Sequence, residues 1–345
     1  MRINVSSSGR GFSAAADQSL LDAALDASFN LPHSCRGGNC GACRARLLSG
    51  EVRYPNGPPL GLSDDEIADG MILLCQARAS TDLTIETFEM RPADQAGSKR
   101  LPCRIERLEF LSHDVMGVLL RLPAAASFIF EAGQYIDIML PGGLRRSYSI
   151  ASPPHDSRPL ALHVRHVAGG EFSDRLLREN KSGALLSIEG PLGQFVYRPS
   201  ALPMLMVAGG TGIAPVLSIL RHVVENGIER DITLYWGVRD ERDLYAHAAL
   251  ESLAGRAAHM RYRPVLSEPT GQWRGRTGLV HEAPLADIED VEQYDVYAAG
   301  PPAMVAAVRR DFEARGVAAT RLFFDSFDYA RDTAARQRTS AATKS

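Results

Sequence analysis

Four cysteines are the residues of this sequence best placed to do chemistry. Three of them lie in the run Cys35–Cys43 with the spacing C-x4-C-x2-C, and the fourth lies far along the chain; the four are Cys35, Cys40, Cys43 and Cys75. Four thiolates with this spacing hold two irons inside a tight loop. The pattern therefore predicts a 2Fe-2S cluster, which accepts and releases electrons one at a time.

The residues between the cysteines favour the same interpretation. A loop around a sulfide-bridged cluster needs backbone N–H groups aimed at sulfur and residues that tolerate positive φ, and Gly37, Gly38 and Gly41 meet that need. Zinc sites usually show two compact C-x2-C pairs. Disulfides would require secretion, whereas Met1–Val5 begins a polar-alternating strand without an apolar signal core. Zinc, disulfides and buried unreactive thiols are the alternatives.

A second group of residues suits a flavin. In Arg145–Ser152, arginine can bind a phosphate, an aromatic ring can cover the isoalloxazine and a serine hydroxyl can bond a ring nitrogen. In Gly169–Leu177, glycines precede a helix, where free backbone N–H groups and the helix dipole favour a pyrophosphate. A pyrophosphate indicates FAD, because FMN carries a single phosphate. An ordinary alternating strand is the alternative for the first run.

Two further glycine turns suit a dinucleotide. The run Val207–Pro215 takes a strand into a glycine turn and then a helix, which is the layout for close approach of backbone to a pyrophosphate. The run Tyr297–Met304 places another turn at the end of a later strand, where open α/β sheets bind ligands. The first turn departs from G-x-G-x-x-G. A plain helix start with proline at its first position is the alternative for the second.

Several domains must position these groups. The chain has 345 residues, a length that fits two or three domains. Its net charge of −3 gives no electrostatic case for binding nucleic acid or an anionic membrane surface. Leu202–Leu220 is largely apolar, but glycine and proline interrupt it, so we expect no membrane span.

The two ends of the chain differ in character from its middle. Residues 1–91 show short strands around one helix at Leu20–Leu25, as a β-grasp ferredoxin domain would. Residues 92–101 are polar and without periodicity, which indicates a linker. Residues 331–345 are rich in Ala, Thr, Ser and Arg and are expected to be disordered.

The middle of the chain shows two different periodicities. Residues 102–198 alternate apolar and polar side chains in Tyr135–Leu140 and Leu160–Arg165, which predicts an antiparallel β-barrel that binds FAD. Residues 199–330 alternate five strands with helices, the first helix at Ile213–Glu225. This order predicts a parallel α/β sheet that binds NAD(P).

In this order, the three groups of motifs resemble the ferredoxin–NADP reductase superfamily with an N-terminal plant-type ferredoxin. That group contains the reductase components of bacterial aromatic-ring, methane and phenol oxygenases and the CDP-6-deoxy-glucoseen reductases. The resemblance covers about residues 1–330. It implies that the four cysteines are iron ligands, that Arg146 holds the flavin phosphate, and that Tyr148 and Ser149 lie against the flavin ring and its reactive nitrogen.

The resemblance also implies further cofactor contacts. They are His163, Val164 and Arg165 beside the isoalloxazine, Gly170 and Ser173 at the pyrophosphate, Gly210, Thr211, Gly212 and Pro215 at the dinucleotide, and Gly300, Pro301, Pro302 and Met304 at the nicotinamide end. Phe327 is the candidate for covering the other face of the flavin, with a core aromatic as the alternative. The family usually has Cys-Gly-Pro-Pro, and here Ala299 stands at the cysteine position.

Coenzyme preference has a weaker signal. After a predicted strand, Arg239 could pair with a 2′-phosphate and Asp240 could accept from a free ribose hydroxyl. The resemblance favours NADH, with NADPH as the alternative.

The expected function follows from electron counting. A dihydronicotinamide gives two electrons together whereas a 2Fe-2S cluster takes one, so a flavin is expected between them. Basic residues near the cysteine loop could raise the reduction potential of the cluster; they are Arg36, Arg44 and Arg46. We expect a cytoplasmic, monomeric reductase that passes electrons to a partner oxygenase or deoxysugar dehydrase. A free-standing flavin oxidoreductase that reduces small acceptors and an iron–sulfur module with a degenerate reductase are the alternatives.

Overall fold

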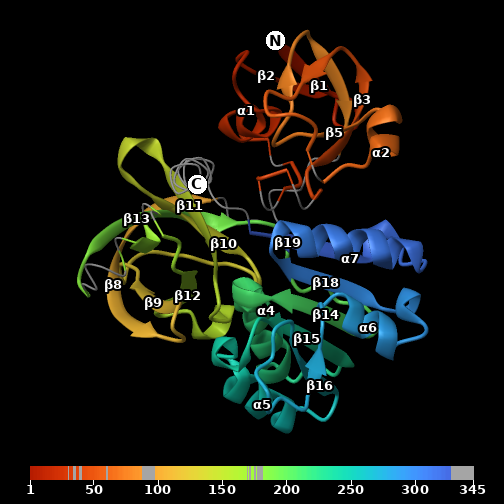
Figure 1. Ribbon diagram of the computed structural model, residues 1–345. Helices are drawn as coiled ribbons and strands as arrows, with labels where there is room; N and C mark the ends of the chain where they lie inside the picture. Colours follow the sequence, from red (N-terminus) through yellow and green to blue (C-terminus); the bar gives the residue numbers. More distant parts are fainter. Residues whose placement is uncertain are drawn as a thin grey trace, which may run out of the picture. The chain divides into compact units, whose positions relative to one another are not determined.

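The computed structural model describes residues 1–29, 31–33, 36–38, 41–59, 61–87, 98–168, 170, 172–174, 176 and 182–327. These residues fall into two compact units, one of residues 1–87 with 324–327 and one of residues 98–323 (Figure 1). The expected iron ligands Cys35 and Cys40, most of the expected linker and the expected disordered tail lie outside the described residues.

The first unit contains a five-stranded mixed sheet in the order β2-β1-β7-β3-β5. Its strands are β1 (Arg2–Val5), β2 (Arg10–Ser13), β3 (Arg44–Ser49), β5 (Met71–Leu73) and β7 (Leu83–Glu86), and a separate pair is formed by β4 (Val52–Arg53) and β6 (Arg78–Ala79). Strands β1 and β7 are parallel, and the other pairs in the sheet are antiparallel.

Two helices accompany this sheet. Helix α1 (Leu20–Asp26) begins where the Ser19 hydroxyl accepts from the backbone N–H of Asp22, and its apolar face is buried. This helix confirms the one expected at Leu20–Leu25. The sequence analysis expected a single helix here, and the structure adds α2 (Asp64–Ala68), whose Ser63 and Glu66 form a capping box.

The second unit begins with a six-stranded antiparallel sheet in the order β11-β10-β13-β8-β9-β12. Its strands are β8 (Lys99–Phe110), β9 (Val115–Arg121), β10 (Tyr135–Met139), β11 (Arg145–Ser149), β12 (Leu160–Arg165) and β13 (Leu185–Leu192). A single bridge between Ile150 and Leu162 joins the chain just after β11 to β12, the strand at the opposite end of the order. Strand β8 begins at Lys99, within the range expected to be linker.

The second unit also contains a six-stranded sheet in the order β17-β16-β15-β14-β18-β19, although the last three residues of β19 are grouped with the first unit. Its strands are β14 (Met204–Gly209), β15 (Ile232–Val238), β16 (Met260–Leu266), β17 (Arg276–Thr277), β18 (Asp295–Gly300) and β19 (Leu322–Ser326). The pairs from β17 to β18 are parallel, as expected. The sequence analysis counted five strands, because the two-residue β17 is too short to show a periodicity.

Helices connect these strands and bury them. They are α4 (Ile213–Glu225), α5 (His247–Arg256), α6 (Glu282–Asp287) and α7 (Pro302–Ala314). Strand β14 is buried along its whole length, as is β18, so apolar residues run through both without alternation. The described helices include none that is long and apolar enough to cross a membrane.

A buried ion pair ties the parallel sheet together at the amino ends of its strands. The Arg230 guanidinium donates to Asp295 at 2.6 Å and to the carbonyl oxygens of Leu202 and Arg198, and both charged side chains are almost fully buried. Because both partners are desolvated, removing one leaves an uncompensated buried charge.

We therefore expect Asp295→Ala to lower the free energy of unfolding by about 3–5 kcal/mol. Tryptophan fluorescence during denaturant unfolding measures this selectively, since Trp236 and Trp273 are the only two tryptophans and both belong to this part of the chain. The control is Glu251→Ala in α5, whose carboxylate is 62% exposed and pairs with the partly exposed His247; its loss is expected to stay below about 1 kcal/mol. Equal losses in the two variants would contradict the prediction.

Candidate functional site

Strand pairing brings two distant cysteines together. Strands β3 and β5 are antiparallel with Arg44 opposite Leu73, and the backbone N–H of Leu74 donates to the carbonyl of Cys43 at 3.1 Å. Cys43 precedes β3 directly and Cys75 follows Leu74, so the pairing places these two cysteines at the same end of the two strands. Both are buried. Two of the four expected iron ligands are thus neighbours in the structure.

The described part of the cysteine loop has the backbone that a cluster needs. Gly38 and Gly41 have φ values of 86° and 71°, and Arg36 has a φ of 50°. A Cβ on Gly38 would lie 2.6 Å from Cγ of Gln76, so only glycine fits there. Gly38 and Gly41 thus have the left-handed conformation that the sequence predicts, whereas Gly37 does not and the preceding Arg36 does.

Three carbonyl groups of this loop are held from outside. The side chain of Gln76 donates to the carbonyl of Arg36 at 3.0 Å, and the backbone N–H of Gly61 donates to that of Gly38 at 2.8 Å. The Arg44 guanidinium lies 3.4 Å from that of Gly41. In a trans peptide the next N–H points away from the carbonyl. The N–H groups of Gly37 and Ala42 therefore point away from the donors that hold the two preceding carbonyls. This arrangement fits a cluster whose sulfurs accept backbone hydrogen bonds.

The expected flavin residues lie on strand β11. Tyr148 is opposite Ile136 and Arg146 is opposite Ile138 in the pairing with β10, so the two side chains share one face of the strand. On the other face Ser147 donates to Asp137 at 2.6 Å, which fixes the strand. Burial raises the pKa of the Tyr148 phenol, which stays neutral. Ser149 ends the strand and is buried.

The expected pyrophosphate turn lies beside Tyr148. The rings of Tyr148 and Phe172 have centroids 5.4 Å apart. The Ser173 hydroxyl accepts from the backbone N–H of Val167 at 3.1 Å, and a Cβ on Gly170 would lie 2.7 Å from that hydroxyl. Ser173 therefore closes this turn, and Gly170 is buried at a point of it where there is no room for a side chain. Gly169 lies outside the described residues.

The two expected dinucleotide turns meet at the centre of the parallel sheet. Strand β14 lies between β15 and β18. The chain adds β15, β16 and β17 on one side of β14 and then returns to add β18 on its other side. Ligands bind at such a switch point, beyond the carboxyl ends of the strands. The turn Gly210–Gly212 follows β14, and Gly300–Met304 follows β18, at this same edge.

Contact between these turns is close enough to require glycine. A Cβ on Gly212 would lie 2.0 Å from the carbonyl oxygen of Ala299, and one on Gly209 would lie 2.6 Å from Sδ of Met304. Ala299 is fully buried within the core of the sheet. The position where the family usually has cysteine is thus filled by a methyl group beneath the turn. Pro215 is buried in the first turn of α4.

Strand β12 of the antiparallel sheet contacts the first of these turns. A Cβ on Gly210 would lie 3.2 Å from the guanidinium of Arg165. His163 lies 3.2 Å from the hydroxyl of Tyr245, and the Trp236 indole, which packs edge-on against Tyr245, donates to the carbonyl of Gly210 at 2.9 Å. His163 and Arg165 therefore face the nucleotide-binding side, whereas Val164 between them is buried in its own sheet.

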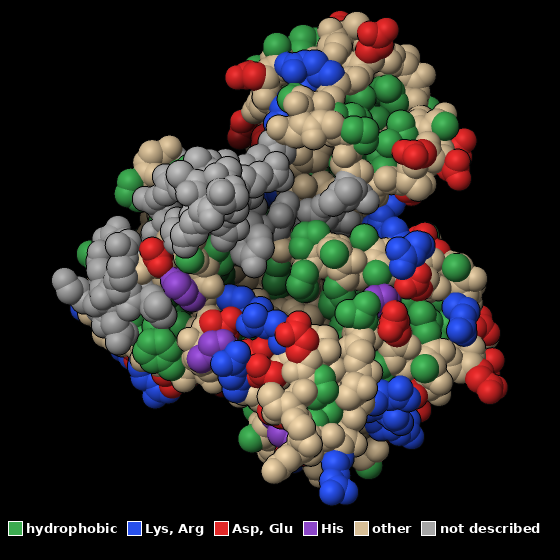
Figure 2. Space-filling view, in the orientation of Figure 1, with side chains coloured by type: hydrophobic (Ala, Val, Ile, Leu, Met, Phe, Trp, Pro, Cys, Tyr) green, Lys and Arg blue, Asp and Glu red, His purple; other side chains and the backbone are tan. Residues whose placement is uncertain are grey.

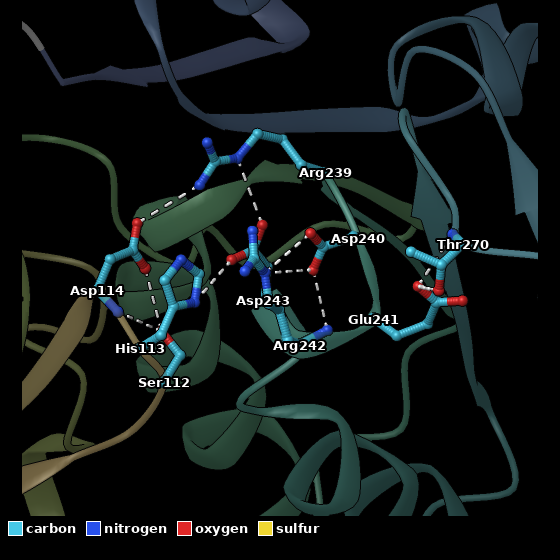
Figure 3. A network of polar contacts seen from close by, with 9 residues as sticks. All are labelled: Ser112, His113, Asp114, Arg239, Asp240, Glu241, Arg242, Asp243 and Thr270. Atoms are coloured by element: carbon cyan, nitrogen blue, oxygen red, sulfur yellow. Dashed lines mark hydrogen bonds and ion pairs between the residues drawn. The ribbon is translucent and has the colours of Figure 1, made fainter.

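An ion-pair network joins the two sheets beside this contact (Figure 3). The Asp114 carboxylate lies 3.4 Å from Arg165 and 3.6 Å from Arg239. Asp243, almost fully buried, lies 3.4 Å from Arg239 and 3.5 Å from His113. The side chains of His113, Asp114 and Asp243 could approach a metal ion together. However, the guanidinium groups of Arg165 and Arg239 already balance the two carboxylates. We interpret the network as a link between the sheets.

This network changes the interpretation of the two expected coenzyme-selecting residues. Arg239 is bound to two carboxylates of the protein rather than being directed only toward a ligand. Asp240 accepts from the backbone N–H of Arg242 and pairs with its side chain at 2.9 Å, which caps the turn Glu241–Asp243. The sequence analysis missed Asp114 and Asp243, because no spacing marks an ion pair between segments so far apart.

The cofactor contacts expected of Phe327, Thr211, Pro301 and Pro302 stay predictions. Phe327 follows β19 and is half-buried, and its contact with a flavin stays a prediction. Thr211 is half-buried in the first turn, and Pro301 and Pro302 begin α7. On the face drawn in Figure 2, acidic and basic side chains are interspersed over the second unit.

Substitution at Gly212 tests the close contact between the turns. We expect Gly212→Ala to displace the turn and to weaken binding of NAD⁺ by at least about tenfold, since a shift of about 1 Å at a binding group has large effects. Calorimetry of NAD⁺ binding measures this. Gly255→Ala is the control, because a Cβ there meets nothing within 4 Å. Unchanged affinity in Gly212→Ala would show that the turn is not part of the site.

His163 gives a prediction about pH. Burial lowers its pKa from 6.5 to about 4, so between these values the unfolded chain binds a proton that the folded chain does not. Stability rises with pH where the unfolded state binds more protons, so this histidine lowers the free energy of unfolding as pH falls from 6.5 to about 4. We expect His163→Gln to have a shallower slope in that window, followed by tryptophan fluorescence. Identical slopes would contradict burial of a neutral imidazole.

Comparison with known families matches three domains in turn along the chain. Residues 3–80 match the 2Fe-2S iron-sulfur cluster binding domain, residues 102–197 the oxidoreductase FAD-binding domain and residues 206–310 the oxidoreductase NAD-binding domain. The cysteine loop, the turn at Gly170 and the two glycine turns therefore lie in domains that bind iron–sulfur, FAD and NAD respectively. The expected cofactor classes are confirmed.

The chain also aligns with relatives over nearly their whole length. The chain is 38% identical over 327 residues to the CDP-6-deoxy-L-threo-D-glycero-4-hexulose-3-dehydrase reductase of Yersinia pestis, covering 95% of this chain and 98% of that protein. It is 37% identical over 331 residues to the terephthalate 1,2-dioxygenase reductase component 2 of a Comamonas species, covering 94% and 97%. The crystal structure of the Amycolatopsis cytochrome P450 reductase GcoB matches with a TM-score of 0.75 and 33% identity, covering 94% and 98%. The chain therefore belongs to the ferredoxin–NADP reductase superfamily, in the group of iron–sulfur flavoprotein oxidoreductases that carry an N-terminal 2Fe-2S domain.

Proposed function

We propose that this protein is an NADH-dependent reductase that passes electrons through FAD and a 2Fe-2S cluster to a partner protein. The observation that carries the proposal is the presence of all three cofactor-binding domains on one chain, each with its glycine turns or cysteine pair in place. The relatives are reductases of an oxygenase or of a deoxysugar dehydrase. The acceptor proposed here is accordingly a protein of one of these two kinds, and the reductase acts as a monomer.

The chain's own residues have defined tasks in this proposal. Arg146 would bind the flavin phosphate, Tyr148 would pack against the ring, and Ser149 would lie at its reactive nitrogen, all presented by β11. Gly170 would admit the pyrophosphate at a turn that Ser173 closes. Because Tyr148 contacts Phe172 of the same turn, the strand and the turn belong to one pocket edge.

The nucleotide side would bind NADH at the switch point of the parallel sheet. The turns Gly210–Gly212 and Gly300–Met304 would hold the dinucleotide with their backbone. Arg165 reaches this turn from the flavin side and brings a positive charge toward it. Preference for NADH over NADPH is supported by Arg239, whose charge is already compensated by Asp114 and Asp243 and is poorly placed to attract a 2′-phosphate.

When bound, FAD supplies the conversion between the electron pair of NADH and the single electrons of the cluster. The protein needs no general base for this exchange; its residues bind the rings, align them and exclude water. His163, kept neutral by burial, helps to hold β12 against Tyr245 of the nucleotide-binding domain.

We also propose the finer description of the domains. The first sheet with α1 is a β-grasp ferredoxin domain at residues 1–91, and the antiparallel sheet is a β-barrel at residues 102–198, which the bridge from Ile150 to Leu162 supports. The nucleotide-binding domain would extend from 199 to 330.

Removing one iron ligand tests the proposed route. We expect Cys75→Ser to abolish the paramagnetic signal of the reduced cluster and NADH-dependent reduction of cytochrome c. The same variant should retain anaerobic bleaching of the flavin by NADH, because its flavin and nucleotide sites are intact. Absorbance and low-temperature electron paramagnetic resonance measure these steps separately.

The matched control is Cys103→Ser. Cys103 is buried in β8, and burial raises its pKa to about 12, so it is an unreactive thiol outside the expected ligand set. This variant should keep both the cluster signal and cytochrome c reduction. Reduction of cytochrome c at the wild-type rate by Cys75→Ser would instead favour a flavin oxidoreductase that works without its cluster.

A further inference from the structure

Arg44 occupies a special place at the cysteine loop. It follows Cys43 directly, and its guanidinium donates to the carbonyl of Gly61 at 2.7 Å and lies 3.4 Å from the carbonyl of Gly41. Gly61 in turn donates its backbone N–H to the carbonyl of Gly38. Arg44 is therefore connected to two carbonyl groups of the loop. It contacts that of Gly41 directly and that of Gly38 through Gly61.

A carboxylate of α2 holds this arginine. Glu66 lies 2.8 Å from the Arg44 guanidinium, and both side chains are partly buried. The same carboxylate accepts from the backbone N–H of Ser63 at 2.8 Å, and the backbone N–H of Glu66 returns a bond to the Ser63 hydroxyl. The capping box of α2 therefore fixes the position of the negative charge opposite Arg44.

Other charges near the loop are arranged differently. Arg46 points toward the carbonyl of Asp69, at the far end of α2, with which it bonds at 2.8 Å. Asp64 and Asp65 are exposed in the first turn of α2. Among the described carboxylates, the one that contacts the Arg44 guanidinium is that of Glu66.

We propose that the Arg44–Glu66 pair positions the loop around the cluster and sets the reduction potential of the cluster. Arg44 holds the loop carbonyls so that the backbone N–H groups stay directed at the cluster, and Glu66 offsets the arginine's charge and so keeps the reduction potential low. Reduction adds one electron and one negative charge to the cluster, which an uncompensated guanidinium would stabilise. The inference rests on the proposed function, because it requires the 2Fe-2S cluster.

The test is the substitution Glu66→Gln, measured in the holoprotein by a dithionite titration followed by electron paramagnetic resonance. Glutamine keeps the shape and the capping box and removes only the charge. We expect the midpoint potential of the cluster to shift in the positive direction. The control is Asp65→Asn, which removes the same charge from the same helix turn without contacting Arg44; its shift should be less than half as large.

The opposite change provides a second variant. Arg44→Gln removes the positive charge and the bonds to the loop, so the potential should fall and iron should be lost faster to a chelator. Equal shifts in Glu66→Gln and Asp65→Asn, or an unchanged or raised potential in Arg44→Gln, would overturn the inference. A wild-type protein that binds no iron would instead refute the proposed function itself, so the two failures are distinguishable.

Discussion

The close approach of backbone to backbone at the carboxyl ends of β14 and β18 is the constraint on which the nucleotide-binding half depends. With only 2.0 Å between a hypothetical Cβ on Gly212 and the carbonyl of Ala299, no side chain can separate the two turns. The two turns are therefore in direct backbone contact, and α4 and α7 both begin there. Two helix starts at one switch point give a place suited to the phosphates of a dinucleotide.

Contacts from the flavin-binding sheet extend this arrangement. Arg165 and His163 leave β12 on the same face and reach the turn at Gly210 and the ring of Tyr245. The Trp236 indole supports the same carbonyl from the parallel sheet. Asp114 pairs with Arg165 and with Arg239, so one carboxylate contacts arginines from both domains. Figure 3 shows its pair with Arg239. The orientation of the two domains is therefore specified by polar contacts beside the site rather than by apolar packing alone.

Much of this architecture could be predicted from the sequence because local patterns encode it. The strand Ile232–Val238 and the helix Ile213–Glu225 have the bounds that periodicity predicts, since long apolar runs and helix-ending glycines are local signals. The two-residue β17 carries no period. Helix α2 has a capping-box signature in Ser63 and Glu66, which the sequence analysis passed over because the helix buries no apolar face. The ion pairs of Asp114 and Asp243 depend on distant segments, and no local pattern reveals them.

The strand order has a consequence for how the protein is made. Strands β14 to β17 follow one another along the chain, whereas β18, the other neighbour of β14, is encoded after all of them. A ribosome releases the chain from its amino end, and domains assemble as they emerge. The edge of β14 that β18 covers therefore stays open until Asp295–Gly300 has left the ribosome, and the coenzyme site is completed only after the strands β14 to β17 have all emerged.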